Sequence, residues 1–310
     1  MHALRTSVQA SVSAARQNGG MNTRQQAYWM LALAMAGVGS TVIASKWIGI
    51  SLPPFTATTI RFTIAAPLLF LLLKMTRTQI VLPGWRDALL LATQAAAGSA
   101  GYTVFLISGS TRTSAANAGI ILGSLPAVAA CVSSLLLRER MASAMKWAIL
   151  LATLGVMAVS ISGVNTGGSA HASLSGDVLI LFAVLSESLF ILLNRKLRRP
   201  VAPLLLAFFM SVLGLLICLP FAVDECLTQH IVWQAASLWA CAYYALVPTV
   251  LGFWLWYSGS EKLGAHEASL MTSIAPVSAV LLSVLLMHES ISAAQMSGLA
   301  LILVAIWVGR

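Results

Sequence analysis

Beyond residue 26, the chain alternates between long apolar runs and short polar connections. A helix of about 20 apolar residues is long enough to cross a bilayer. Lipid offers no partner to the backbone groups of an open strand, so we expect each apolar run to be a helix. The pattern therefore predicts an all-α polytopic membrane protein with ten transmembrane helices, at residues 27–46, 55–73, 87–107, 114–137, 146–163, 175–194, 203–223, 235–257, 266–287 and 292–309.

The second half of the chain repeats the first. Residues 109–140 and 259–290 are identical at ten of 32 positions without a gap, and the same offset of 150 pairs Lys46 with Lys196. Fixed-offset similarity is the mark of a duplicated unit. Each unit holds five predicted helices, an odd number, so the second copy enters the membrane from the opposite face. The sequence predicts two inverted five-helix repeats, a design used for alternating access.

The domain boundaries follow from this reading. The first repeat covers residues 27–163 and the second covers 175–310. An extracytoplasmic linker, 164–174, joins them, and a cytoplasmic tail, 1–26, precedes them. The tail is polar and lacks the apolar core of a secretory signal, so we expect it to be disordered.

Composition and charge agree with a membrane protein. Hydrophobic residues make up 59% of the chain and charged residues 9%, against about 25% charged in a typical soluble domain. With the N-terminus inside, 15 of the 18 Lys and Arg residues fall on the cytoplasmic side and only Lys46 and Arg112 fall outside. The positive-inside rule then places both termini in the cytoplasm, across the plasma membrane. This distribution also argues that the net charge of +9 serves orientation and not nucleic-acid binding.

Four stretches carry a family resemblance. They are Lys46 followed by Pro53, Pro54 and ATTIRFTIAAPLLFLLL; TSAANAGIILGSLPAVAA; the Gly-Asp pair at 176–177; and GFWLWYSGSEKLGAHEASLMTSIAPVSAVLLSVLLMHE. The chain resembles the drug/metabolite transporter superfamily in its ten-helix EamA-type branch. The resemblance implies solute transport, commonly the export of amino acids, related metabolites or drugs. Where such relatives often carry Trp in the sixth helix, this chain has Glu187, which implies a more polar pocket.

Glu187 is the strongest candidate for a solute-binding residue. It lies near the middle of the sixth predicted helix, with Asn194 seven residues on along the same face. A carboxylate at this depth is costly unless it faces protein or water, so it either binds an amine or carries a coupling proton. The alternative is a structural Glu paired with Arg61, which lies in the second helix. Arg61 itself could reach the interface, bind a substrate carboxylate or clamp two helices, and the resemblance favours the clamp.

Further pocket candidates come from the other helices. Gln94 and Tyr102 in the third helix, Asn117 in the fourth and Trp254 in the eighth could line a solute pocket. Helix breaks at equivalent places in two repeats point to a transporter's binding region. We therefore expect gating or kink positions at Pro126, Pro276, Pro248 and Gly98.

Other polar residues have simpler structural interpretations. Lys46 at a helix end reads as an interfacial anchor, and Asp177 as the cap of the sixth helix. Glu267 in a first helical turn favours the helix dipole. Gly119 and Gly123 have the small-residue spacing that permits close helix packing, either between the repeats or in a homodimer.

The sequence predicts a secondary carrier for a small organic solute. We find no phosphate loop, zinc motif, nucleophile elbow or clustered metal ligands, so we expect neither enzymatic activity nor a cofactor. The expected partners are the solute and membrane lipids, with coupling to protons or another ion left open. Export is the favoured direction, and an importer of the same fold or a non-transporting sensor is the alternative.

Overall fold

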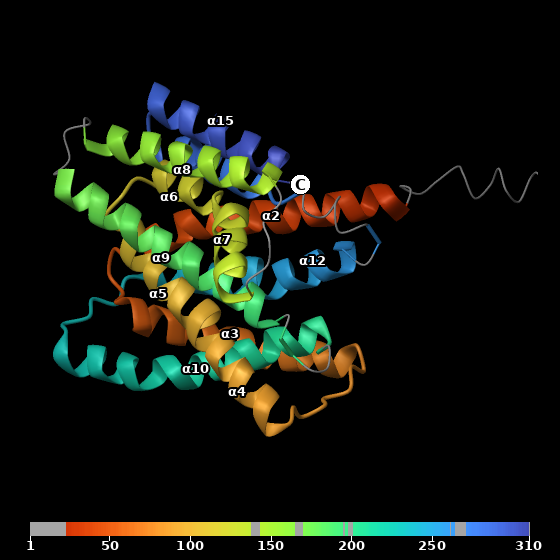
Figure 1. Cartoon of the computed structure of the whole chain (residues 1–310). Helices are drawn as coiled ribbons and strands as arrows, with labels where there is room; N and C mark the ends of the chain where they lie inside the picture. The colour runs from red at the N-terminus through yellow and green to blue at the C-terminus, as the bar shows by residue number, and fades with distance from the viewer. Residues whose placement is uncertain are drawn as a thin grey trace, which may run out of the picture.

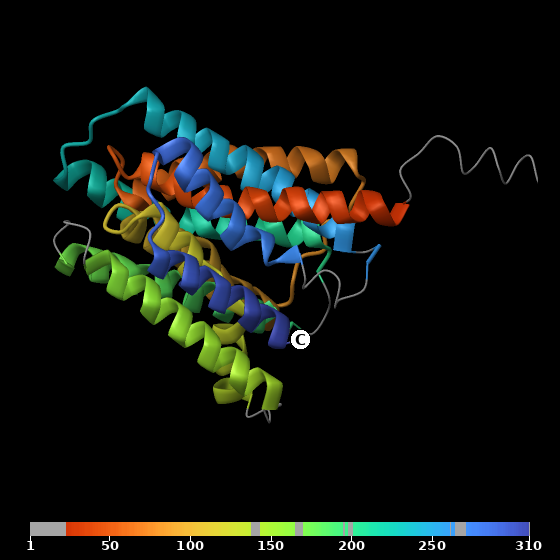
Figure 2. The same cartoon turned by 90° about the horizontal axis from the view of Figure 1, so that it is seen from above.

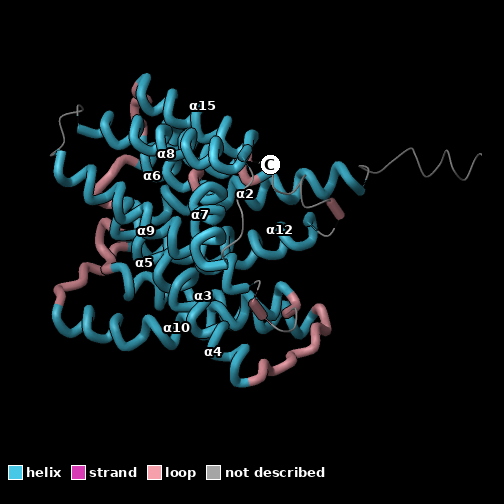
Figure 3. The backbone as a smooth tube through the Cα atoms, viewed as in Figure 1, coloured by secondary structure: helices cyan, strands magenta, loops and turns pink. Residues whose placement is uncertain are grey.

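The computed structural model describes residues 23–137, 143–164, 170–194, 196–197, 201–260, 262–263 and 271–309. These residues form helices joined by short turns and loops, and none of them lies in a β-strand (Figure 3). The helices are α2 Thr23–Ile48, α3 Pro54–Met75, α4 Trp85–Gln94, η1 Ala95–Gly101, α5 Tyr102–Ser110, α6 Ala115–Leu122, α7 Leu125–Leu137, α8 Ser143–Val164, α9 Ala170–Asn194, α10 Pro203–Thr228, α11 Ala235–Tyr244, η2 Ala245–Leu251, α12 Gly252–Ser260, α14 Ile274–Met287 and α15 Ala293–Val308.

Most of these helices are long and apolar enough to cross a membrane. Within the described ranges seven continuous helices meet that requirement, and the bent pair α6 and α7 makes an eighth if it is one span. Helices α14 and α15 are apolar but shorter, with 14 and 16 residues. The all-helical membrane architecture is confirmed, while the count of ten crossings stays a prediction.

The two halves contain matching irregular helices. The continuous helices Trp85–Ser110 and Ala235–Ser260 each have 26 residues. Each contains a seven-residue π-helical segment, η1 in the first half and η2 in the second. The two segments begin at Ala95 and Ala245, the offset of 150 seen in the sequence. Helices α2 and α9, which open the two halves, run in opposite directions (Figure 1), the arrangement that inverted repeats produce.

The halves are interleaved and do not sit as separate bundles. Helix α2 packs mainly against α12 and α14 of the second half, whereas α9 packs against α5 and α7 of the first. Counterpart helices also pair directly, α3 with α10 and α8 with α15. The pair α8 and α15 lies side by side in both views (Figures 1 and 2). Any cavity in the middle therefore has walls from both halves.

The fourth apolar run is broken between Leu122 and Leu125, where the axes of α6 and α7 differ by 45°. Pro126 is the second residue of α7 and cannot donate the backbone hydrogen bond that would continue α6. Pro276 has a similar place in the first turn of α14, where a proline is tolerated. The prolines thus mark helix beginnings, and the break lies just before Pro126 and not at it.

Some predicted boundaries are shifted. Helix α2 begins at Thr23 and α9 at Ala170, so these helices start four and five residues before the predicted 27 and 175. Residues 1–22 of the expected tail and 165–169 of the expected linker lie outside the described residues, as does Glu267.

The described cations gather at one end of the bundle. Alternating helix directions bring the start of α2, the α3–α4 connection and the end of α9 to the same end, on the right in Figure 1. The exposed cations there are Arg24, Lys74, Arg77, Arg86, Lys146, Lys196 and Lys262, whereas Arg112 is exposed near the opposite end. We call this the Lys196 end, and the opposite one the Lys46 end.

Candidate functional site

A cavity of about 640 Å³ lies between the two halves. Its walls come from α2, α3, η1, α5, the α6–α7 break, α9, α10, α11, η2, α12, α14 and α15. The lining residues of α9 run from Val184 to Asn194, in its second half, and Asn194 is exposed. The cavity therefore reaches the Lys196 end and stops short of the Lys46 end. Its volume is in the range of a small-molecule site.

Arg61 of α3 is the buried cation of this cavity. Its side chain is only 7% exposed. The guanidinium carbon lies 4.3 Å from the ring centroid of Phe62 and 4.6 Å from that of Tyr244, so two aromatic faces support the charge. Its Nε is buried without a hydrogen-bond partner. Tyr244 belongs to α11, so Arg61 does bridge two helices, but through aromatic rings and not through a carboxylate.

Glu187 of α9 lines the same cavity and is half-buried. Lys46 forms an ion pair with Glu289, and within the described residues no such contact joins Glu187 to Arg61. Glu187 and Arg61 therefore do not form the ion pair that the structural alternative required. The cavity thus contains one carboxylate and one guanidinium that form no ion pair with each other.

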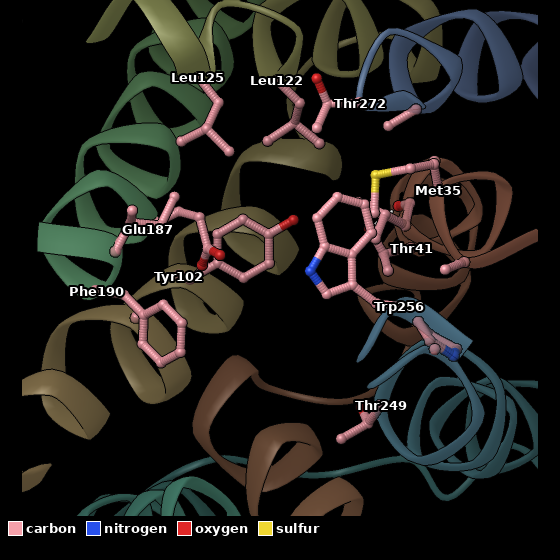
Figure 4. A pocket seen from close by; sticks show the side chains of 18 of the residues that line it. Met35, Thr41, Tyr102, Leu122, Leu125, Glu187, Phe190, Thr249, Trp256 and Thr272 are labelled. Atoms are coloured by element: carbon pink, nitrogen blue, oxygen red, sulfur yellow. Dashed lines mark hydrogen bonds between the residues drawn. The ribbon is translucent and has the colours of Figure 1, made fainter. Parts of the chain in front are cut away.

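Aromatic side chains form much of the remaining wall. Figure 4 shows Glu187, Tyr102 and Phe190 on one side of the cavity and Trp256 across from Tyr102. Phe190 lies directly against the backbone of Gly98 in η1, where a Cβ atom would be 2.2 Å from the Phe190 Cβ. Gly98 is therefore needed for close packing between η1 and α9. The walls suit a solute that carries an apolar or aromatic group.

The structure brings eight of the eleven predicted site residues to the cavity. These are Arg61, Gly98, Tyr102, Pro126, Glu187, Asn194, Pro248 and Pro276. It does not bring Gln94, Asn117 or Trp254 there. Gln94 is fully buried and its amide nitrogen donates to the Phe190 carbonyl at 3.1 Å, so it positions α9 behind the wall.

The tryptophan prediction was wrong by two residues. Trp254 is 47% exposed on the outside of the bundle, while Trp256 lines the cavity. Two residues along a helix are about 200° apart, so only one of these side chains can face inward. The sequence favoured Trp254 because Trp256 lies nearer the helix end, where aromatic belts are common.

Three polar predictions near the Lys46 end also need correction. Asp177 is not a helix cap, because α9 begins seven residues earlier, and its Oδ1 accepts a hydrogen bond from the Thr113 hydroxyl at 2.6 Å. Lys46 is not a free interfacial anchor, because its Nζ lies 2.9 Å from Glu289 Oε1. Asn117 Oδ1 accepts from Gln295 Nε2 at 2.7 Å, away from the cavity. These side chains hold helices together.

Several residues of these arrangements were missed in the sequence. Phe62, Tyr244 and Phe190 give no signal, since aromatic residues in apolar runs are ordinary. The pairing of Lys46 with Glu289 could have been suspected, because both have charged counterparts at the offset of 150 and charges are rare in this chain. Their partnership was hidden by a separation of 243 residues.

The comparisons with known proteins agree with this architecture. The model of the EamA-like transporter family matches residues 25–161 and again 174–308. The chain is 33% identical to the "uncharacterized transporter YetK" of Bacillus subtilis (strain 168), over 94% of this chain and 90% of that protein. It is 30% identical to an "uncharacterized transporter" of Archaeoglobus fulgidus, over 95% and 90% of the two chains.

A solved crystal structure has a similar fold, with a TM-score of 0.64 at 21% identity, covering 91% of this chain and 95% of the other. Fold, tandem halves and a solute-sized cavity together define a membrane transporter. The chain belongs to the EamA-like transporter family.

Proposed function

We propose that the protein is a secondary carrier in the plasma membrane that exports a small zwitterionic solute of the amino-acid type. The observation that carries the proposal is that one cavity contains the Arg61 guanidinium, whose Nε lacks a hydrogen-bond partner, and the Glu187 carboxylate, and that the two form no ion pair with each other. The Arg61 guanidinium suits a carboxylate, since its planar fork can bind two oxygens at once. Glu187 suits an ammonium group. The aromatic walls would receive the rest of the solute.

The burial of Arg61 supports this reading. A buried charge is costly unless it is paired. The rings of Phe62 and Tyr244 offset part of that cost for Arg61. A solute carboxylate would supply the missing hydrogen bonds, including one to the unsatisfied Nε. The site is thus built to be completed by an anionic group.

The proposed direction follows from the open end of the cavity. The cavity reaches the end of the bundle where the exposed cations gather, which is the cytoplasmic end under the positive-inside rule. A carrier that rests in this state loads its solute from the cytoplasm. Its energy would come from an ion gradient or from the solute's own gradient.

The test is counterflow in liposomes with three matched sets of labelled compounds. The first set contains amino acids, the second the same compounds without the carboxyl group, and the third the same compounds with the amino group acylated. We expect counterflow of the first set, with Arg61→Met abolishing it and Glu187→Gln reducing it at least tenfold, about 1.4 kcal/mol of lost binding. Arg86→Gln, at an exposed cation of the Lys196 end, is the control.

The outcomes separate the possible solutes. If the amines are carried and the amino acids are not, Glu187 binds the solute and the role assigned to Arg61 is wrong. If both variants carry amino acids like the wild type, the proposed site is wrong although the carrier stands.

The direction of transport is tested separately in oriented vesicles. Accumulation into inside-out but not right-side-out vesicles, under the same ion gradient, supports export; the reverse result means import.

A further inference from the structure

The Lys46 end of the bundle is closed by a polar cluster that joins the two halves. Lys46 Nζ of α2 lies 2.9 Å from Glu289 Oε1, in the connection between α14 and α15, and donates to the Thr113 carbonyl at 3.2 Å. The Glu289 carboxylate also accepts from the backbone N–H groups of Ala115 at 2.9 Å and Ala116 at 3.0 Å. We call these five residues the Lys46 clamp. It attaches the first turn of α6 to the second half.

Two neighbouring hydrogen bonds hold the same turn from other helices. Gln295 of α15 donates to Asn117 Oδ1 at 2.7 Å. The Thr113 hydroxyl donates to Asp177 Oδ1 of α9 at 2.6 Å. The turn before α6 is therefore fixed to α2, α9, α15 and the α14–α15 connection. Charge-assisted hydrogen bonds such as those of Glu289 are stronger than neutral ones.

Between the clamp and the cavity, α2 and α6 pack closely against α14. A Cβ atom on Gly119 of α6 would lie 2.4 Å from the Ala279 Cβ of α14. A Cβ atom on Gly39 of α2 would lie 1.9 Å from Ser278 Oγ and 2.4 Å from the Ala275 carbonyl oxygen. Gly39, Gly119 and Ala279 all line the cavity. The three helices thus meet as its wall on the side of the Lys46 end.

The opposite end differs in the corresponding position. Lys196, which the repeat relates to Lys46, is exposed. Asn194 beside it is exposed and lines the cavity. Within the described residues, the cavity reaches the Lys196 end and is closed off from the Lys46 end.

We propose that the Lys46 clamp is the gate of the closed end. For solute to leave on that side, Lys46 and Glu289 must separate and α6 must move away from α14. The clamp stabilises the state that is open at the Lys196 end, and weakening it shifts the population towards the opposite state. This inference rests on the carrier function proposed above.

The test measures access to the cavity from the Lys46 side. Thr41→Cys, at the cavity-lining residue of α2 nearest in sequence to Lys46, is introduced into full-length protein in which Cys131, Cys218, Cys226 and Cys241 are replaced by Ala. A membrane-impermeant thiol reagent is applied from the Lys46 side of vesicles. We expect Glu289→Gln and Lys46→Met each to raise the labelling rate about tenfold, because each removes charge-assisted hydrogen bonds. Lys196→Met, the repeat counterpart, should leave the rate unchanged.

A second variant tests closure directly. Lys46→Cys with Glu289→Cys, in the same cysteine-free protein, removes the clamp, and a short bifunctional thiol reagent then bridges the two positions. Bridging should stop counterflow. In a second preparation that also carries Thr41→Cys, bridging should prevent the impermeant reagent from labelling the solute-free cavity from the Lys46 side, as a comparison of labelling before and after bridging shows. A cleavable bridge should restore both when it is cut.

The results distinguish the gate from the carrier. If folded Glu289→Gln and Lys46→Met proteins label at the wild-type rate, the clamp is not a gate, whatever the transport assay shows. If labelling responds as expected but no compound undergoes counterflow in the wild type, the zwitterion carrier proposal is at fault. Counterflow that continues across the bridged pair overturns the gate.

Discussion

At the residue scale, the cavity shows how a membrane protein can keep two charges apart. Arg61 and Glu187 lie in long apolar helices, where isolated charges are rare and usually functional. Pairing them would have removed part of the cost, and the described structure does not pair them. Aromatic support from Phe62 and Tyr244 keeps Arg61 in place without using up its hydrogen-bond donors. Under the proposed function, these donors remain available to a solute carboxylate.

Glu225 shows the opposite use of a buried charge. At the end of α10 it accepts from the backbone N–H groups of Phe55 at 3.2 Å and Thr56 at 2.7 Å, which begin α3. Glu225→Ala should lower the free energy of unfolding by about 1–3 kcal/mol, because these donors lose their partner in a buried place. Chemical unfolding in detergent measures it. The control is Asp224→Ala, at the exposed acid next to it; equal effects of the two changes would contradict the capping role.

Gly39 allows the close contact between α2 and α14 to be tested with one substitution. Its missing side chain lets α2 approach the α14 backbone, since a Cβ would collide with the Ala275 carbonyl oxygen, which cannot rotate away. Gly39→Ala should destabilise the protein by about 1–3 kcal/mol, as overpacking does elsewhere. Gly84→Ala is the matched control, because a Cβ there meets nothing within 4 Å. Thermal unfolding in detergent compares them, and similar midpoints would refute the close contact.

The sequence predicted cavity residues correctly where the residue type itself is unusual in a membrane helix. Charges and prolines in apolar runs stand out, so Arg61, Glu187, Pro126 and Pro276 were found, and all four line the cavity. Which of two nearby aromatics faces inward depends on helix phase, and phase is altered by a π-helical segment that composition does not reveal. Without that phase, the choice between Trp254 and Trp256 rested on distance from the helix end, which favoured the wrong residue.

At the element scale, η1 and η2 set that phase. A π-helical segment arises where a helix holds an extra residue, and it is frequent at functional sites. Each segment precedes a helix that contributes an aromatic to the cavity, Tyr102 after η1 and Trp256 after η2. Pro248 lies within η2 and Gly98 at the matching place in η1. The sequence identified both as breaks, but it could not show that the helix continues through them.

Deleting the exposed Ala96 should convert η1 into regular helix and leave the phase of α5 nearly unchanged, because seven residues of π-helix turn about as far as six residues of α-helix. The widened turn that places Gly98 against Phe190 would be lost, so we expect counterflow to fall while the protein still inserts into the membrane. Ala96→Leu, which keeps the residue count, should transport normally. Normal transport by the deletion variant would show that the π-helical turn has no role in the site.

At the scale of the whole molecule, duplication could be inferred and interleaving could not. A fixed offset in the sequence reports two related units, but not which helix packs against which. The packing of α2 on the second half and of α9 on the first is a tertiary property that apolar helices of similar composition do not encode locally. It explains why the cavity, the Lys46 clamp and the Glu225 cap all join residues from both halves.

The orientation of the molecule is the last prediction, and it decides the direction assigned to the open cavity. The α3–α4 connection and the α10–α11 connection lie at opposite ends of the bundle (Figure 1). The first carries Arg77 and leads into Arg86, whereas the second follows Asp224. Since short basic connections stay in the cytoplasm, Gln229→Cys in the cysteine-free protein should react with an impermeant thiol reagent on intact cells. Thr78→Cys should react only after permeabilisation. The reverse labelling pattern would mean that the protein has the opposite orientation in the membrane. The cavity would then open to the outside, and the same site would serve import.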